Sequence, residues 1–320
     1  LCHESEAGGQ MTITTIGLDI IGDLHGHYRA LLALLAELGY LEEDGLYQHP
    51  EGRQLIFVGD LVDRGPHVRE TVQLVRALVE SGRARCLLAN HEYNILCYHL
   101  WVNGEFLRVH SESNARQVLA TLQAFADDPG EWLDHLEWFK TLPLFLELPG
   151  LRVVHACWDQ HWIDYVRGRL PGALLTPSFV YESSRKGTPA HKAVETLLKG
   201  WEATLPECRF YHDAEGIARS QARLRWWPGR GEAWGDWLVT DAGATGCEQL
   251  PFDESLLPGP LYPEEAPPVF CGHYWLRGTP RLQAANVCCL DYSIAKAGQL
   301  VAYRWNGEQE LQAENLVAVG

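Results

Sequence analysis

Long hydrophobic runs are missing from this sequence. No stretch of about 18 or more uncharged apolar residues occurs, and the longest apolar stretches, 143–148 and 151–157, have the length of strands. The sequence therefore predicts no membrane span. The first ten residues are polar and lack the apolar core of a signal peptide, so residues 1–10 are expected to be an upstream extension or expression remnant without function.

Paired cysteines and excess basic charge are missing as well. The nine cysteines form no Cys-x-x-Cys pair, and the adjacency of Cys288 and Cys289 would strain a mutual disulfide, so we expect a reducing, cytoplasmic compartment. Lys and Arg number 26 against 42 Asp and Glu, a net charge of −16, which disfavours long nucleic acids unless a local basic patch overrides it. A small anionic substrate stays compatible, because bound dications would dominate the field inside a site. The oligomeric state is not predicted.

The length and the patterning indicate a single α/β domain over residues 11–320 with a sizeable buried core. The first 90 residues alternate strand and helix signals, a βαβαβ pattern with buried, mostly parallel strands. We expect strands over 16–21, 54–58, 85–88, 143–148 and 151–155, and helices over 27–38, 67–81, 91–103 and 114–127.

The character of the sequence changes between residues 159 and 266. This stretch is rich in Trp, Gly, Pro and Arg and has one clear helical segment, near 190–199, so we interpret it as a cap or substrate insertion. Strand signals resume at 269–271, 287–290 and 300–305. The last two are predicted to be antiparallel strands that close a second sheet.

Polar side chains with metal-binding atoms follow several of the expected strands. They are Asp23, His25, Asp60, Asn90, His155 and His273. Because the carboxyl ends of neighbouring strands in an open α/β sheet face one crevice, we expect these side chains to converge. Carboxylate, amide and imidazole ligands suit Mn, Fe or Zn better than Mg or Ca. Six ligands are too many for one tetrahedral site and about right for two metals that share a carboxylate.

The motifs Gly22-Asp-Leu-His-Gly26, Gly59-Asp-Leu-Val-Asp-Arg-Gly65 and Asn90-His-Glu92 resemble the phosphoprotein phosphatase branch of the calcineurin-like metallophosphoesterases. The resemblance is tight over residues 17–92, rests on single residues at His155 and His273, and leaves the region between them unmatched. It implies a four-layer α/β sandwich, in which two facing mixed sheets flanked by helices hold a dinuclear site. It also implies hydrolysis of phosphate esters by attack of a metal-bound hydroxide.

The resemblance implies a role for each matched residue. Asp23, His25 and Asp60 would hold one metal, and Asp60, Asn90, His155 and His273 the other, with Asp60 as the bridge. Arg64 would bind phosphate oxygens through its planar guanidinium, His91 would protonate the leaving oxygen, and Asp63 would orient His91. Glu92 is expected to position a neighbour. Mn²⁺ is the expected metal.

The sequence departs from the family pattern at three points. Ala89 stands where family members have Gly, which would matter if the position required a positive φ. Ala156-Cys157 replaces a Gly-Gly pair. The second phosphate-binding arginine of protein phosphatases has only candidates, Arg219, Arg223 and Arg225, of which we favour Arg223.

Each of these residues also has a purely structural interpretation. Asp60 and Asp63 could form a turn, and Asn90 could be only a helix cap. His27 and His161 are not expected to be ligands, and the cysteines are expected to be small buried groups. Five tryptophans of the insertion are expected to pack it, with base stacking as the alternative: Trp201, Trp226, Trp227, Trp234 and Trp237.

The function predicted from the sequence is metal-dependent hydrolysis of a phosphomonoester, either a phosphopeptide or a phosphorylated small molecule. A bis(5'-nucleosyl)-tetraphosphatase is the alternative, because both share the core residues. A metal-binding regulator without catalysis would have lost Arg64, His91 or a ligand, and none is missing. A nucleic-acid end-processing enzyme would need a basic groove, for which the net charge gives no support.

Overall fold

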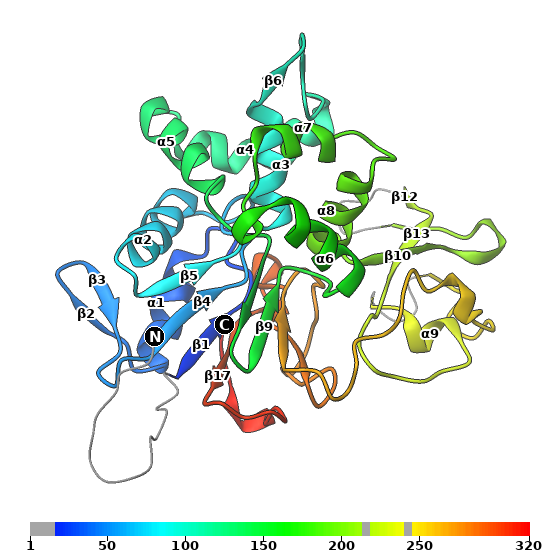
Figure 1. The fold of residues 1–320 in the computed structure, drawn as a ribbon. Helices are drawn as coiled ribbons and strands as arrows, with labels where there is room; N and C mark the ends of the chain where they lie inside the picture. Colours follow the sequence, from blue (N-terminus) through cyan, green and yellow to red (C-terminus); the bar gives the residue numbers. More distant parts are fainter. Residues whose placement is uncertain (1–16, 213–217, 240–244) are drawn as a thin grey trace.

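Two β-sheets lie face to face at the centre of the molecule, with helices outside them (Figure 1). The structure is a computed structural model that describes residues 17–212, 218–239 and 245–320. The extension predicted at 1–10 lies outside these residues. None of the described helices is long and apolar enough to cross a membrane.

The first sheet has six strands in the order β16-β17-β1-β4-β5, and β18 also pairs with β17. Strands β1, β4 and β5 run parallel, as the βαβαβ pattern predicts, whereas β17 is antiparallel to β1. The strands are β1 (Leu18–Ile21), β4 (Gln54–Phe57), β5 (Ala84–Cys86), β16 (Asp291–Tyr292), β17 (Gln299–Trp305) and β18 (Leu316–Val319).

The second sheet has four strands in the order β15-β14-β9-β8 and is also mixed. Strand β14 pairs in parallel with β15 and β9, and β8 is antiparallel to β9. The strands are β8 (Phe145–Leu148), β9 (Leu151–Val154), β14 (Val269–Cys271) and β15 (Val287–Cys289).

The prediction that segments 287–290 and 300–305 are antiparallel partners is wrong. Strand β15 belongs to the second sheet and β17 to the first, where it pairs with β1. The chain changes sheet between them through β16, which pairs with β17. Each segment is apolar on both faces, so its periodicity indicates a buried strand without indicating its partner.

Alternating side chains of each central strand point into two different cores. In β4, Leu55 and Phe57 belong to the cluster under the outer helices, whereas Ile56, together with Val58 just after the strand, belongs to the cluster between the sheets. From the second sheet, Val153 and Phe270 enter the same inter-sheet cluster. Burial on both sides explains why these strands read as continuous apolar runs, and the result is the predicted four-layer sandwich.

Helices α1 (Tyr28–Glu37) and α2 (Val68–Glu80) pack against the first sheet, α1 on β17 and β18 and α2 on β5. Helices α3 (Asn90–His99) and α4 (Glu112–Ala124) occur close to their predicted positions. Helix α5 (Pro129–Phe139) was not predicted, although it begins with a recognisable signal: the Asp128 side chain accepts from Glu131 N at 3.0 Å, and Pro129 follows.

The stretch from 159 to 266 is more regular than its composition predicts. Two unpredicted helices, α6 (Gln160–Arg169) and α7 (Pro177–Ser183), precede the predicted one, α8 (Pro189–Lys199). Beyond them, β10 (Trp201–Thr204) pairs with β13 (Gln221–Leu224), β11 (Tyr211–His212) pairs with β12 (Ala218–Arg219), and α9 (Trp234–Trp237) follows. Figure 1 shows this part to one side of the sheets, with short hairpins β2 (Leu41–Glu43) to β3 (Leu46–Gln48) and β6 (Trp101–Val102) to β7 (Glu105–Phe106) elsewhere.

Candidate active site

The predicted ligands converge at one edge of the sandwich because the parallel strands of both sheets end there. The β1–β4 register pairs Ile21 with Phe57, so Asp23 and Asp60 leave the sheet side by side. From the second sheet, His155 follows β9 and His273 follows β14, and Gly272 N donates to His155 O at 2.8 Å. The two sheets meet at this edge, where His155 Nδ1 lies 2.9 Å from Val58 O.

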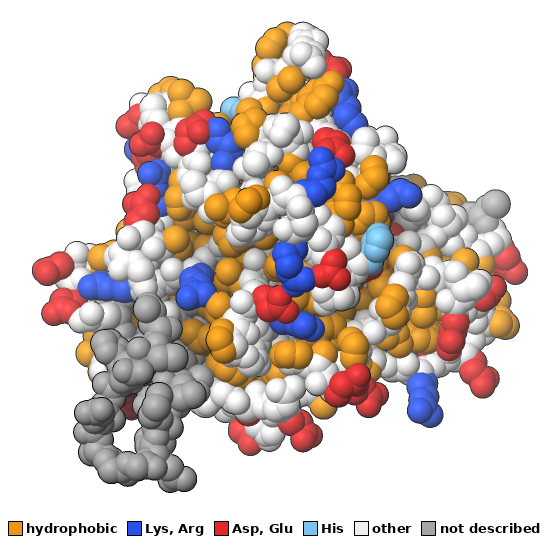
Figure 2. All heavy atoms as spheres, in the orientation of Figure 1, with side chains coloured by type: hydrophobic (Ala, Val, Ile, Leu, Met, Phe, Trp, Pro, Cys, Tyr) orange, Lys and Arg blue, Asp and Glu red, His pale blue; other side chains and the backbone are white. Residues whose placement is uncertain are grey.

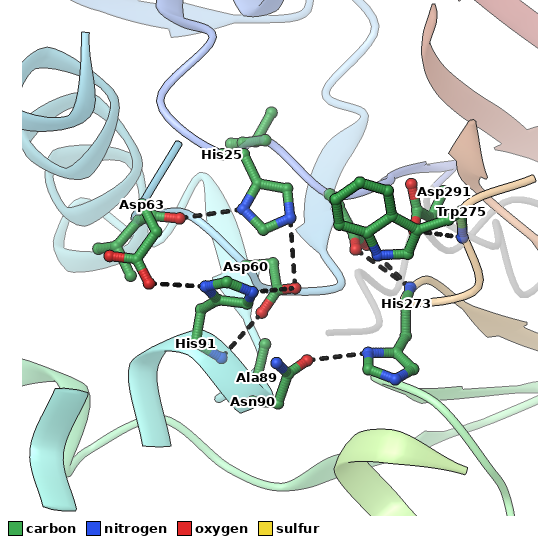
Figure 3. A network of polar contacts seen from close by, with 12 residues as sticks. His25, Asp60, Asp63, Ala89, Asn90, His91, His273, Trp275 and Asp291 are labelled. Carbon is green, nitrogen blue, oxygen red and sulfur yellow. Dashed lines mark hydrogen bonds and ion pairs between the residues drawn. The ribbon is translucent and has the colours of Figure 1, made fainter. Parts of the chain in front are cut away.

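Asp60 lies at the centre of the cluster, between the imidazoles of two groups (Figure 3). Its Oδ2 is 3.5 Å from His25 Nε2 and 3.5 Å from His155 Nε2. In the second of these groups, Asn90 Oδ1 is 2.9 Å from both His155 Nε2 and His273 Nδ1. Two sets of side chains have ligand atoms within 4.8 Å of one another, and both contain Asp60: His25, Asp60 and His91, and Asp60, His155 and His273.

The histidine tautomers leave lone pairs that need a cation. Because a carbonyl only accepts, the neutral form of His25 or His155 would carry its proton on Nδ1, toward Val62 O or Val58 O. Their Nε2 lone pairs then face the oxygens of Asp60 and Asn90, which also only accept. His25 Nε2 and His273 Nε2 are buried without a hydrogen-bond partner. In these tautomers, the nitrogen lone pairs and the oxygen atoms cannot form hydrogen bonds with one another, but they suit divalent metal ions as ligands.

The electrostatics of the cluster point the same way. Burial, followed by His91, lowers the pKa of His25 to about 3, and burial with Arg223 lowers the pKa of His273 well below its ordinary value. Burial, Asp291 and Asp60 raise the pKa of Asp23 well above its ordinary value. Neutral imidazoles and crowded buried carboxylates are the states that bound cations stabilise.

Asp60 and His91 form a contrasting pair. Burial pushes the pKa of Asp60 upward, but His155 and His91 outweigh it, so the pKa lies well below its ordinary value. Burial pushes the pKa of His91 downward, but Asp60 and Asp63 outweigh it and raise it. The pKa of His91 is therefore shifted in the direction that suits a general acid.

Glu92 supports the loop that carries Asp60, as its expected positioning role requires. Its carboxylate accepts from the backbone N–H groups of Asp60, Leu61 and Val62 at 3.0, 2.8 and 3.2 Å. Several residues of the site, including Asp60 (φ 52°) and His273 (φ 73°), adopt left-handed backbone angles that non-glycine residues rarely adopt. Such angles persist only where surrounding contacts stabilise them. At Asp60, the hydrogen bonds to the Glu92 carboxylate provide this stabilisation.

The departure at Ala89 has a simple explanation. Ala89 has φ −107° and ψ 179°, an extended conformation that any residue adopts, so a glycine is not required there. The neighbouring position that does require glycine is Gly59. It has φ 99°, and a Cβ added there would lie 2.5 Å from the Ala89 Cβ. Ala156 and Cys157, at the second departure, are fully buried.

The cluster opens into a cleft of about 610 Å³ with an unusual charge for so acidic a chain. Among the described residues, seven basic ones line it, against Asp60 and Glu202 as the acidic ones: Arg64, Arg108, Lys199, Arg219, Arg223, Arg277 and Lys296. By contrast, Lys and Arg on the face drawn in Figure 2 are scattered among other side chains and form no continuous basic surface. The cleft therefore suits a compact anion that carries several charges.

Of the three candidate arginines, Arg219 and Arg223 line the cleft, and Arg223 Nη1 donates to His273 O at 3.1 Å. Arg225 instead lies over the Trp237 ring at 4.7 Å and donates to Arg230 O. Neither His27 nor His161 belongs to a ligand group among the described residues. The five tryptophans predicted to pack the insertion are each at most 6% exposed, which agrees with packing and leaves them no face for a base.

Sequence reasoning missed three residues of the site. Asp291 is buried beside Asp23 and accepts from Trp275 N at 2.7 Å, and Thr121 donates to Asp63 at 2.5 Å. Trp275 lies under the guanidinium of Arg64, with Cζ 4.3 Å from the ring centroid. Asp291 follows a buried strand as Asp23 and Asp60 do, so its position held a signal; Thr121, in mid-helix, held none.

Comparisons with known proteins agree with this geometry. The profile of the family described as calcineurin-like phosphoesterase matches residues 18–204. A protein of Halalkalibacterium halodurans named bis(5'-nucleosyl)-tetraphosphatase PrpE, asymmetrical, is 33% identical over 192 residues, 58% of this chain and 72% of the relative. A protein of the same name from Geobacillus sp. strain WCH70 is 49% identical over 189 residues, 57% of this chain and 74% of the relative.

A similar fold occurs in a protein serine/threonine phosphatase from Saccharomyces cerevisiae with similarity to human phosphatase PP5. The TM-score is 0.51 at 13% identity, and the match covers 96% of this chain and 79% of the yeast chain. At this identity the likeness is one of fold.

Proposed function

This chain belongs to the calcineurin-like phosphoesterases, a family of metal-dependent hydrolases, and we propose that its substrate is a small polyphosphate ester of the dinucleoside tetraphosphate class. One observation carries the proposal: two ligand groups that share Asp60 lie at the foot of a cleft with seven basic residues. A chain of phosphates can contact several of these residues, whereas a single phosphate contacts fewer. The relatives named bis(5'-nucleosyl)-tetraphosphatase support the same class.

Within this proposal, Asp23, His25 and Asp60 hold one metal ion, and Asp60, Asn90, His155 and His273 hold the other. By distance, His91 also lies within the first ligand group. We assign it to proton donation because its Nδ1 is 2.6 Å from Asp63 Oδ2, the arrangement in which a carboxylate orients an acid/base imidazole. When bound, the two ions would lower the pKa of a shared water and offset charge on the phosphate oxygens.

The remaining side chains of the site bind the phosphate oxygens and protonate the leaving oxygen. Arg64 and Arg223 contact phosphate oxygens, and His91 Nε2, which lies 4.0 Å from Asp60 Oδ2 on the cleft side, gives its proton to the leaving oxygen. Asp63 keeps the proton of Nδ1 in place and so holds the ring in the orientation that exposes Nε2.

The metal, the compartment and the cap belong to the same proposal. The mixed carboxylate, amide and imidazole set favours Mn²⁺, with Fe or Zn as alternatives. The described cysteines are unbridged and buried, which supports a reducing, cytoplasmic compartment. Residues 159–266 act as a cap, because β13 of this segment carries Arg223 to the cleft.

Initial rates on three substrates test the proposal. Protein loaded with Mn²⁺ is given diadenosine tetraphosphate, p-nitrophenyl phosphate and a phosphoserine peptide, each over a range of concentrations. We expect the highest kcat/KM on the tetraphosphate, and the products, ATP plus AMP or two ADP, identify the bond cleaved. Asp60→Asn, prepared in parallel, controls for contaminating phosphatases. A higher kcat/KM on the phosphopeptide or the nitrophenyl ester would favour the phosphomonoesterase predicted from the sequence.

A further inference from the structure

Two cations share one aromatic ring beside the candidate metal site. The Arg64 guanidinium carbon lies 4.3 Å from the centre of the Trp275 indole, and the Lys296 ammonium lies 3.9 Å from it. All three residues line the cleft together with Asp60. The face of an indole attracts cations, so one ring can hold both charges near each other despite their mutual repulsion.

A buried carboxylate holds this arrangement in place. Asp291 accepts from Trp275 N at 2.7 Å and from Ser293 N at 2.9 Å, and Ser293 Oγ donates to Leu276 O at 3.0 Å. Lys296 ends the short 3-10 helix Ile294–Lys296 that follows Ser293. The loop that carries Trp275 and the loop that carries Lys296 are therefore joined through Asp291 and Ser293, and Figure 3 shows Asp291 beside Trp275.

Each of the two loops contains a residue with a left-handed backbone conformation. Trp275 has φ 56° and Ser293 has φ 60°, in the left-handed region that costs energy for residues other than glycine. Trp275 also lies near His25, with ring centroids 6.1 Å apart. The tryptophan thus occupies a costly conformation next to a candidate ligand, and the result is a defined position for two cations at the mouth of the site.

The two cations lie close enough together for one chain of phosphates to contact both. The charges of Arg64 and Lys296 can be no further apart than the sum of their distances to the common ring. Within the proposed function, the phosphate that reacts at the metal pair is bound by Arg64 and Arg223. A neighbouring phosphate in the same anhydride chain would meet the second cation.

We infer that Lys296, positioned by Trp275, forms with Arg64 a second phosphate subsite, which binds a phosphate of an anhydride chain next to the one that reacts. Lys296 is then the residue that distinguishes polyphosphates from monophosphates, and Trp275 is a positioning residue. The inference rests on the proposed function for the nature of the substrate, but the anion-binding preference can be measured without turnover.

Calorimetric titration of the metal-loaded protein tests the subsite. The ligands are a methylene-bridged triphosphate, which cannot be cleaved at its bridges, and inorganic orthophosphate. Lys296→Met should raise the Kd of the triphosphate analogue by about tenfold or more and that of orthophosphate by less than about threefold. Lys186→Met removes the same charge from an exposed position outside the cleft and should leave both values unchanged.

Two substitutions of Trp275 separate positioning from packing. Trp275→Phe keeps a ring for the cations and should retain most of the preference for the triphosphate analogue. Trp275→Leu removes the ring and should weaken that ligand nearly as much as Lys296→Met. The thermal midpoint and the metal content of both variants, by elemental analysis, show whether either substitution acts through the fold or the metals.

The outcomes are distinct from those of the proposed function. An unchanged triphosphate Kd in Lys296→Met, or equal weakening of both anions, would overturn the subsite. So would equal behaviour of the Phe and Leu variants at position 275. If the wild-type protein fails to cleave diadenosine tetraphosphate but shows the predicted Kd ratios, the proposed substrate is wrong and the polyphosphate subsite stands.

Discussion

His91 Nδ1 lies 2.6 Å from Asp63 Oδ2, and both side chains are almost fully buried. The other oxygen of Asp63 accepts from Thr121 Oγ1 of helix α4, and Thr121 Oγ1 in turn accepts from Asp63 N at 2.9 Å. The carboxylate therefore has one position, and the imidazole has one orientation. Nε2 is left facing Asp60 at 4.0 Å, toward the cleft.

This relationship predicts a leaving-group dependence for His91→Asn. We expect the variant to keep both metals and to lose turnover by roughly 10²–10⁴ on an alkyl phosphate, the usual contribution of one general acid. The loss on p-nitrophenyl phosphate should be much smaller, because nitrophenolate departs without a proton. Steady-state kinetics on the two esters, with metal content measured alongside, decide the point.

Asp63→Asn should reproduce the pattern in milder form, because an amide still contacts the imidazole but no longer stabilises its charge. Equal losses on both esters in the His91 variant, with the metals retained, would show that His91 binds phosphate or maintains structure and does not donate the proton.

Removal of the metals should abolish activity. Bound cations would satisfy the buried Nε2 atoms of His25 and His273 and offset the repulsion between the carboxylates of Asp23 and Asp60. We expect a chelator to stop hydrolysis and Mn²⁺ to restore it, with elemental analysis to confirm depletion. Full turnover by protein shown to be metal-free would contradict the two-metal proposal.

Asp60→Asn should cost more metal than any other single ligand change. Asp60 belongs to both ligand groups, whereas His273 belongs to one. Metal content after dialysis should fall toward zero in Asp60→Asn and toward one ion per chain in His273→Ala. Lower metal content in the His273 variant would show that Asp60 is not the bridge.

A separate prediction concerns stability, at the end of β1 away from the site. Asp19 is fully buried and accepts from Arg53 Nη2 at 2.8 Å and from Tyr40 Oη at 2.9 Å. Asp19→Ala leaves the Arg53 charge buried without this partner and should lower the free energy of unfolding by about 3–5 kcal/mol. Tyr40→Phe removes one hydrogen bond to a charged group and should cost about 1.5–3 kcal/mol.

Thermal or urea unfolding measures both changes. Metal content should be the same in the two variants as in the wild-type protein, because neither residue reaches the ligand cluster. If Asp19→Ala unfolds at the wild-type midpoint, the buried ion pair contributes nothing to stability.

Local signals along the chain were enough to predict much of the fold. The βαβαβ pattern, the helices near 27–38 and 67–81 and the strand at 151–155 occur where periodicity places them, because a strand or helix must turn its apolar side chains toward a core. The same logic located α8. It failed for α5, α6 and α7, although α5 begins with the cap signal Asp128-Pro129.

The sequence by itself determined the chemistry that the site can carry, because Asp23, His25, Asp60 and Asn90 follow strands whose parallel pairing sends them to one edge. Only the tertiary structure decided which distant residues join them. The partner of β17 depends on which sheet completes its hydrogen bonds, and periodicity carries no information on that. Asp291 reaches Asp23, and Arg64 reaches the Trp275 ring that also holds Lys296, through contacts between segments more than 200 residues apart, so no local pattern records these contacts.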